Sequence, residues 1–186
     1  MIGYLPKQLN INGVDRAIWS DFRTALLIFQ TCADPDMDDQ EKAMCIIDCL
    51  YQDLDCIPTE DYQEANDKAV WFLEGGDNVS NKESSKKLMD WEQDEQLIFS
   101  AVNKVAGHET RSVDYLHWWT FLGYMRETGE CLFNTVLSIR EKRNKGKRLE
   151  KYEQDFYREN KALIDIKVKL SPEEQAEIDY WNKLLG

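Results

Sequence analysis

Leu116-His117-Trp118-Trp119-Thr120-Phe121-Leu122 places two adjacent tryptophans and a phenylalanine beside one of only two histidines in the chain. At helical spacing, one face carries Leu116, Trp119 and Leu122, and another carries Trp118 and Phe121. A helix that is apolar over most of its circumference must be enclosed by other elements. The stretch therefore predicts a central helix wrapped by others, with start signals at 112–114 and stop signals at 126–129.

The rest of the composition supports a substantial core around that helix. The chain has 186 residues, of which 42% are hydrophobic and 11% aromatic. A domain of this size buries roughly 70% of the surface of its unfolded chain. This content is too apolar for a wholly disordered protein.

The charge is strongly acidic and unevenly spread. The net charge is −12, yet residues 140–169 carry eleven Lys or Arg against six Asp or Glu, a net of +5 that leaves −17 elsewhere. The average field repels phosphates, which argues against nucleic acid and anionic membranes and favours a protein partner. We find no bilayer-spanning apolar run and no signal-peptide pattern in residues 1–6, so we expect a cytoplasmic protein.

Short-range signals predict an opening hairpin followed by helices. Asn12-Gly13 stands between apolar-alternating segments, which is a strong hairpin signal because both residues tolerate positive φ. Helical periodicity then predicts helices over these ranges: 21–33, 38–55, 59–74, 90–105, 114–126 and 131–148, the last divided at Gly146. The polar residues between Gly75 and Lys87 predict an exposed mobile loop.

The spacing of apolar residues changes twice towards the end of the chain. Alternation of apolar and charged residues over 164–170 predicts a third strand that pairs with the hairpin. Ser171-Pro172 then starts a final amphipathic helix. We therefore expect a mainly α fold: a compact multi-helix domain over 1–170 with a small N-terminal β-hairpin, and a C-terminal helical appendage over 171–186.

Cysteines and acids each permit a metal hypothesis. Cys45, Cys49 and Cys56 have spacings that suit one side of a helix, but the same helix needs that side for its apolar face, and neither His nor CxxC lies near. Two acidic groups, Glu60-Glu64-Asp67 and Glu92-Asp94-Glu95, would suit Mg²⁺-dependent nucleotide hydrolysis if they faced each other across a bundle. Because their spacing departs from the paired ExxE and ExxD pattern of such enzymes, a solvated charged face is the favoured interpretation. We expect no catalytic residue, no metal and no cofactor.

Two further features have a structural and a functional interpretation. His117 has no nucleophile beside it in sequence, so we predict a buried polar cluster in which Asp94, Arg23 or Arg140 satisfies it. The basic stretch 140–151 would suit a nucleic acid, but interleaved acids favour a solvated helix face.

Four pieces of the sequence together resemble one family. They are Asp21-Phe22-Arg23 after the hairpin, Trp91-Glu92-Gln93-Asp94, the Leu116–Phe121 block, and Ile139-Arg140. In order and approximate spacing they resemble the bacteriophage gene-product-fifteen family of long-tailed phages infecting Gram-positive hosts, over residues 5–145. The motif residues that the resemblance marks look structural: Phe22, Arg23, Trp91, Asp94, His117, Trp118, Trp119, Phe121 and Arg140.

The resemblance implies a tail-module protein similar to tail-assembly chaperones, which hold the tape-measure protein soluble before the tail tube polymerises around it. We therefore expect a phage tail protein, first the tape-measure protein, as the partner, in the cytoplasm of the infected bacterium and outside the mature virion. Ile178, Trp181, Leu184 and Leu185 are the candidates for client binding or self-association, and packing of this helix on its own domain is the alternative. A Mg²⁺-dependent nucleotide hydrolase and a regulator that binds a host protein or nucleic acid are the rival functions.

Overall fold

The computed structural model describes residues 3–77, 87–167 and 172–185. Its α-helices are α1 (Phe22–Cys32), α2 (Asp39–Leu50), α3 (Tyr62–Leu73), α4 (Glu95–Ala106), α5 (Trp118–Arg126), α6 (Leu132–Asn144), α7 (Lys151–Glu159), α8 (Lys161–Ile164) and α9 (Pro172–Leu185). Short 3₁₀ turns are η1 (Leu54–Cys56), η2 (Thr59–Asp61) and η3 (Thr110–Ser112). The mainly α class is confirmed.

The predicted hairpin is also confirmed. Strands β1 (Gln8–Ile11) and β2 (Val14–Ala17) pair antiparallel, with Ile11 opposite Val14. The two turn residues have φ values of 47° at Asn12 and 83° at Gly13, as a tight two-residue turn requires. Leu9 and Ile11 are buried, and β1 packs against α3.

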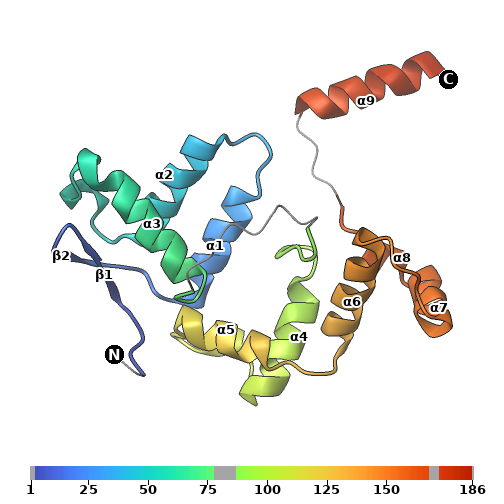
Figure 1. Ribbon diagram of the computed structural model, residues 1–186, viewed down its shortest axis with the longest axis horizontal. Coiled ribbons are helices and arrows are strands. Elements are labelled where there is room, and N and C mark those ends of the chain that lie inside the picture. The colour runs from blue at the N-terminus through green and yellow to red at the C-terminus, as the bar shows by residue number, and fades with distance from the viewer. Residues whose placement is uncertain (1–2, 78–86, 168–171, 186) are drawn as a thin grey trace.

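The helices form one large core and one small one (Figure 1). Helices α1, α2 and α3 pack in succession, and α5 contacts both α1 and α4. The large core extends from the hairpin to Phe133, whereas the small core holds Val136, Ile139 and Ile164. Leu97 of α4 packs against both cores, so α4 joins the two parts of the molecule.

The bounds of α2, α4 and α5 differ from the predicted ones by several residues. Helix α2 ends at Leu50 because Tyr51 turns extended and pairs with Ile18 of the hairpin segment. Helix α4 starts at Glu95 because the Asp90 carboxylate accepts from the N–H groups of Glu92 and Gln93 and holds a turn before the helix. Helix α5 starts at Trp118, with His117 as its N-cap.

The predicted third strand over 164–170 is wrong where the structure describes it. Residues Lys161–Ile164 form α8, and Ile164 is fully buried in the small core. The carbonyl groups of Leu163 and Ile164 accept from the Arg140 guanidinium, so they are not available to a strand partner. Residues 168–170 lie outside the described residues.

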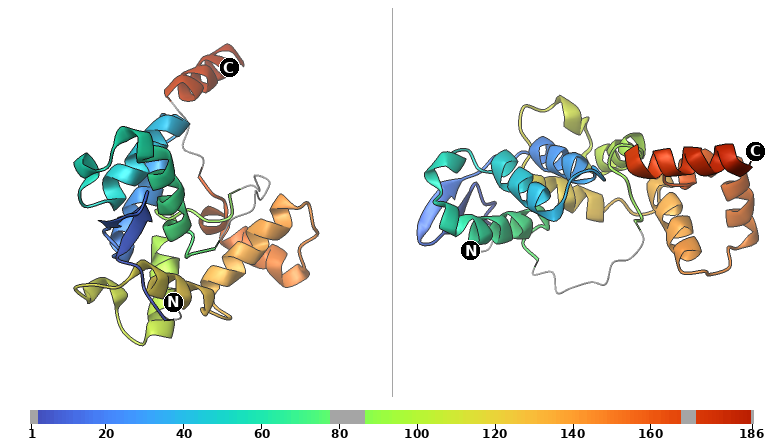
Figure 2. Two further views of the ribbon diagram at one scale, coloured as in Figure 1. Left: turned by 60° about the vertical axis from the view of Figure 1, so that its left-hand side comes forward. Right: turned by 90° about the horizontal axis from the view of Figure 1, so that it is seen from above.

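Helix α9 lies apart from the rest of the molecule (Figures 1 and 2). It falls within the predicted appendage at 171–186, and the division of the chain at residue 170 stays a prediction. Of the loop predicted over 75–87, residues 78–86 lie outside the described part. Among the helices described, none combines the length and the apolar character needed to cross a bilayer.

Candidate functional site

The two tryptophans fasten α5 to the end of α3. The Trp118 and Trp119 indole N–H groups donate to the carbonyl oxygens of Leu73 and Phe72, each at 2.8 Å. Carbonyls in the last turn of a helix have no partner within the helix. The adjacent indoles supply those partners. Trp118 is only 1% exposed and belongs to the interior scaffold, whereas Trp119 is half-buried and lines the hollow that Glu64 and Asp67 also line.

Two glycines after α3 make room for this contact. Gly75 and Gly76 have φ values of 79° and 88°, which favour glycine over residues with a side chain. A Cβ atom at Gly76 would lie 2.9 Å from Cη2 of Trp119, closer than real Cβ contacts. The glycine pair therefore ends α3 and also admits the Trp119 ring.

A chain of aromatic rings brings distant motif pieces together. Phe22 stacks on Phe121 at 4.8 Å between ring centroids, Phe121 stacks on Trp118 at 5.8 Å, and Trp91 meets Trp118 edge-on at 6.1 Å. Phe29 of α1 completes the cluster by stacking on Trp91 at 5.5 Å. The family-like residues of α1, the 91–94 turn and α5 are thus neighbours in one buried cluster.

The starts of α1 and α5 are paired through their backbones. Phe22 N–H donates to Leu116 O, and Trp118 N–H donates to Ser20 O, each at 2.9 Å. The Asp21 carboxylate accepts from Leu116 N–H at 2.9 Å and also caps α1. A single carboxylate therefore serves both helix starts.

Arg23 extends this junction. Its guanidinium pairs with Asp21 and donates to the carbonyl oxygens of Arg111 and Val113, at 3.1 and 2.6 Å. The segment before α5 is thereby held against the start of α1.

His117 is satisfied by backbone groups. Its Nδ1 accepts from Trp119 N–H at 3.0 Å and caps α5, and its Nε2 lies 2.9 Å from Pro6 O. Because Nδ1 accepts and Pro6 O can only accept, we assign the proton to Nε2 and a neutral ring. Burial lowers the pKa of His117 and outweighs the hydrogen bond to Pro6. The predicted cluster of His117 with Asp94, Arg23 or Arg140 is wrong: Arg23 bonds Asp21, while Asp94 and Arg140 bond each other.

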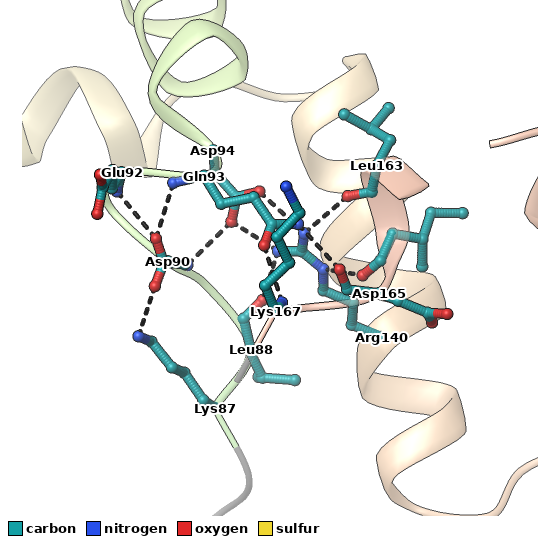
Figure 3. A network of polar contacts seen from close by, with 11 residues as sticks. Lys87, Leu88, Asp90, Glu92, Gln93, Asp94, Arg140, Leu163, Asp165 and Lys167 are labelled. Atoms are coloured by element: carbon teal, nitrogen blue, oxygen red, sulfur yellow. Dashed lines mark hydrogen bonds and ion pairs between the residues drawn. The ribbon is translucent and has the colours of Figure 1, made fainter. Parts of the chain in front are cut away.

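Asp94 and Arg140 form a second, separate polar network (Figure 3). Arg140 Nη1 and Nη2 donate to the two Asp94 carboxylate oxygens at 2.6 and 2.9 Å, and both side chains are almost wholly buried. The other donors reach the carbonyl oxygens of Leu88, Leu163 and Ile164. All five guanidinium donors are used. The network joins α4, α6 and α8 with the segment before α4.

A groove lies between α1 and α4, with a volume of about 420 Å³. Its floor contains Phe22, Ile98 and Phe99, and Leu27 on its α1 side is 54% exposed. The charged residues that line it are Arg23, Glu92, Glu95 and Arg111. Sequence reasoning missed this groove because residues of separate helices form it; the adjacent pair Leu26-Leu27, too wide for one core-facing stripe, was the available signal.

Helix α9 presents an apolar face to solvent. Ile178, Trp181 and Leu184 are 40%, 49% and 62% exposed. Tyr180 contacts the Trp181 ring edge-on and is also exposed. The side chain of Leu185, the fourth predicted partner-binding residue, lies outside the described residues. The three described candidates therefore share one accessible surface.

The two acidic groups lie at different places. Glu64 and Asp67 line a hollow of about 900 Å³ between β1 and α3, whereas Glu92 and Glu95 line the α1–α4 groove. The Asp94 carboxylate is paired with the Arg140 guanidinium. Across residues 3–77, 87–167 and 172–185, no three or more His, Cys, Asp or Glu side chains are grouped to hold a metal ion. The structure thus does not bring together the carboxylates that the hydrolase hypothesis requires.

The cysteines of α2 are partly buried free thiols. Cys45 and Cys49 have sulfur atoms 3.9 Å apart, and Cys56 lies beyond the helix in η1 and is exposed. Burial raises the pKa of the Cys49 thiol to about 11, with the neighbouring Cys45 adding to the shift. A high pKa keeps the thiol protonated and disfavours the thiolate form that metals and electrophiles need.

Several cations of the basic stretch are paired with acids. Lys142 binds Glu153 at 2.6 Å, and Arg143 and Lys145 pair with Asp165 and Glu141. These pairs reduce the positive field that a phosphate would meet.

Comparison with known proteins gives one match. A family model described as bacteriophage Gp15 protein matches residues 1–166. No curated protein and no solved structure matches the chain. The matched range contains every motif residue of the two buried networks and stops before α9.

Proposed function

The chain belongs to the bacteriophage Gp15 protein family, and on this premise we propose that it is a tail-assembly chaperone. In this proposal it binds a phage tail protein, first the tape-measure protein, while the tail is being built. It acts in the cytoplasm of the infected bacterium and is absent from the mature virion.

One observation carries the proposal: the exposed apolar face of α9. Ile178, Trp181 and Leu184 are spaced three residues apart on a helix that stands clear of both cores. Such a face suits helix-in-groove recognition, in which apolar residues on one side of a helix anchor against a partner. A long helical client exposes an apolar stripe before the tail assembles, and the apolar face of α9 would shield that stripe from water.

The acidic charge supports the same role. Because the chain has a net charge of −12, complexes with an apolar client repel one another, and this repulsion opposes their aggregation. The same charge disfavours a nucleic-acid partner. Neither the hydrolase nor the regulator has a specific arrangement of described residues in its favour.

Coexpression tests the proposal directly. The tape-measure protein of the same phage would be expressed alone, with the full chain, and with a Trp181→Ala chain. We expect the full chain to make the client soluble and to copurify with it, and Trp181→Ala to lose most of this effect. Tyr152→Ala is the matched control, because Tyr152 is 68% exposed on α7, away from α9. A client equally insoluble in all cultures would refute the proposal.

A further inference from the structure

Within the part of the chain that the structure describes, strand β1 has no strand partner on one of its two edges. Strand β2 pairs with the other edge, in a sheet of two strands. Ladder bonds in such a hairpin join alternate residue pairs, beginning with the pair that flanks the turn. The bond from Ile18 N–H to Lys7 O, at 3.0 Å, follows this alternation. The backbone groups of Gln8 and Asn10 therefore point to the edge that faces away from β2.

Both ends of this edge are bonded to residues of the helical body. Pro6 O lies 2.9 Å from Nε2 of His117, the N-cap of α5. Asn12 N–H donates to Oε2 of Glu64 on α3 at 3.2 Å. The edge thus faces the helices, and its position against them is fixed at both ends.

The middle of the edge is open. No hydrogen bond with another described residue engages the backbone N–H or C=O of Gln8 or Asn10. Their side chains turn towards β2, where the two amides donate to the Asp15 carboxylate at 3.0 and 2.7 Å. Two backbone donors and two backbone acceptors are therefore available to another extended chain.

The hollow of about 900 Å³ between β1 and α3 borders this open edge. Gln8, Leu9 and Asn10 line it from β1, and α3 supplies the opposite wall (Figure 1). The lining of α3 from Glu64 to Trp71 is about 10 Å long, which is the length of about three extended residues. An extended peptide that joins a sheet edge gains affinity from main-chain bonds and specificity from pockets for alternate side chains.

One end of the hollow is aromatic. Trp71 and Trp119 meet edge-on at 5.3 Å between ring centroids, and both are half-buried. The buried side chain of Leu9 adds to the apolar surface. This end suits an apolar side chain.

The other end of the hollow is acidic. Glu64 and Asp67 are exposed on α3, and Lys68 is the single cation among the described lining residues. Asp67 and Trp71 are one helical turn apart, about 6 Å along α3. Side chains two residues apart in an extended chain share a face and are separated by about 7 Å. One extended segment can therefore place an apolar side chain against Trp71 and a cationic one beside Asp67.

We propose that an extended, cationic segment of a partner polypeptide adds a strand to the sheet along this edge. Its backbone bonds to Gln8 and Asn10, and its apolar side chain and its Lys or Arg, two residues apart, occupy the two ends of the hollow. A second copy of the chain suits the site less well, because it would bring the same carboxylates of Glu64 and Asp67 to the contact. The site is separate from α9 and does not depend on the chaperone proposal.

Selection of a random heptapeptide library on the full chain tests this specificity. We expect enrichment of peptides that have Lys or Arg two positions from an apolar residue. A synthetic peptide of the enriched sequence should then bind in solution, as measured by fluorescence polarisation. A selection without this pattern would overturn the proposal.

Gln8→Pro tests the main-chain bonds. It removes the Gln8 N–H, which β2 does not use, and should weaken binding of the selected peptide at least about 10-fold. Gln8→Ala is the matched control, because it loses the same side-chain bond to Asp15 but keeps the N–H, and it should bind like the wild type. Equal binding by the two variants would contradict strand addition.

Asp67→Lys tests the charge and leaves the strand untouched, so it also serves if proline disturbs the hairpin. It should weaken peptide binding at least about fivefold. Asp114→Lys makes the same change at an exposed residue outside the hollow and should change binding less than about twofold. Equal weakening by both variants would mean general attraction of a cation to an acidic protein, and would overturn the proposal.

Amide hydrogen exchange shows where the peptide lies. Leu9 and Ile11 N–H bond to β2 in the free chain, whereas Gln8 and Asn10 N–H should exchange rapidly. Saturating peptide should slow exchange at Gln8 and Asn10 at least about 10-fold. Unchanged exchange at these two amides would place the peptide elsewhere. Slow exchange in the free chain would assign the edge to a second copy if it grows with protein concentration, or to the chain itself if it does not, and either result overturns the proposal.

The Trp181→Ala chain keeps this site apart from the one on α9. It should bind the selected peptide like the wild type while it loses the effect on the tape-measure protein. Loss of peptide binding in Trp181→Ala would contradict a separate site at β1. A wild-type chain that binds the peptide but leaves the client insoluble would refute only the chaperone proposal.

Discussion

His117 gives both ring nitrogens to backbone partners and is buried, so the folded protein holds the ring neutral. A proton on Nδ1 would remove the acceptor for Trp119 N–H and place a charge in the core. Because burial lowers the pKa of His117 in the folded state, the unfolded chain binds the proton more readily. The stability contributed by neutral His117 is complete above about pH 6.5 and is lost as pH falls towards the folded-state pKa.

Urea unfolding at several pH values tests this prediction. The wild type should lose stability as the pH falls below about 6.5. His117→Asn keeps a capping side chain without a titrating ring, and its loss over that range should be smaller. Equal losses in both proteins would show that carboxylates alone cause the pH dependence.

Gly76 offers a matched pair for measuring the Trp119 contact. Gly76→Ala must hold a φ of 88° and places Cβ 2.9 Å from the Trp119 ring. Gly107→Ala has a φ of 75° with no atom within 4 Å of its Cβ, so it measures the backbone cost alone, about 1 kcal/mol. We expect Gly76→Ala to cost at least about 1 kcal/mol more in free energy of unfolding. Equal costs would mean that the ring moves aside freely.

At the scale of elements, α9 belongs to neither core. Deleting residues 171–186 should therefore leave a folded protein, with its near-ultraviolet circular dichroism and thermal midpoint close to those of the full chain. The same deletion should abolish client binding. A truncated chain that fails to fold would instead favour packing of α9 on its own domain.

The sequence predicted correctly those turns and helix ends that neighbouring residues determine. Asn12-Gly13 fixes the hairpin turn, and Asp38 with Glu41 forms the predicted capping box at the start of α2. The Gly75-Gly76 stop after α3 is likewise a property of the local backbone. These features need no distant partner, so the sequence was sufficient to predict them.

Distant partners decided the elements that sequence reasoning misplaced. The start of α5 depends on pairing of Leu116 and Trp118 with residues almost a hundred positions away. The alternation over 164–167 resembles a strand, but Arg140 binds the carbonyls and fixes a short helix. The α1–α4 groove exists only after separate segments pack, so the sequence offered no more than the local signal of the pair Leu26-Leu27. The same applies to His117, whose partner Pro6 is 111 positions away.

At the scale of the whole molecule, the Asp94–Arg140 pair couples the large core to the small one. Removing one member, as in Arg140→Met, leaves a buried carboxylate without its partner and should cost about 3–5 kcal/mol of unfolding free energy. The double variant Asp94→Leu with Arg140→Met should cost less than the two single variants added together, since neither charge is left unpaired. Urea unfolding of all four proteins provides the measurement, and strict additivity would contradict direct coupling.

The backbone pairing of residues 20–22 with residues 116–118 also has a consequence for synthesis on the ribosome. A nascent chain that has emerged only as far as α4 lacks the partners of Asp21 and the indoles that cap α3. Phe22 then lacks the Phe121 ring and Phe72 lacks the Trp119 ring, although α1, α2 and α3 are already outside the exit tunnel. The ribosome must therefore translate α5 before the large core can form. Until then the nascent chain exposes apolar surface that can aggregate.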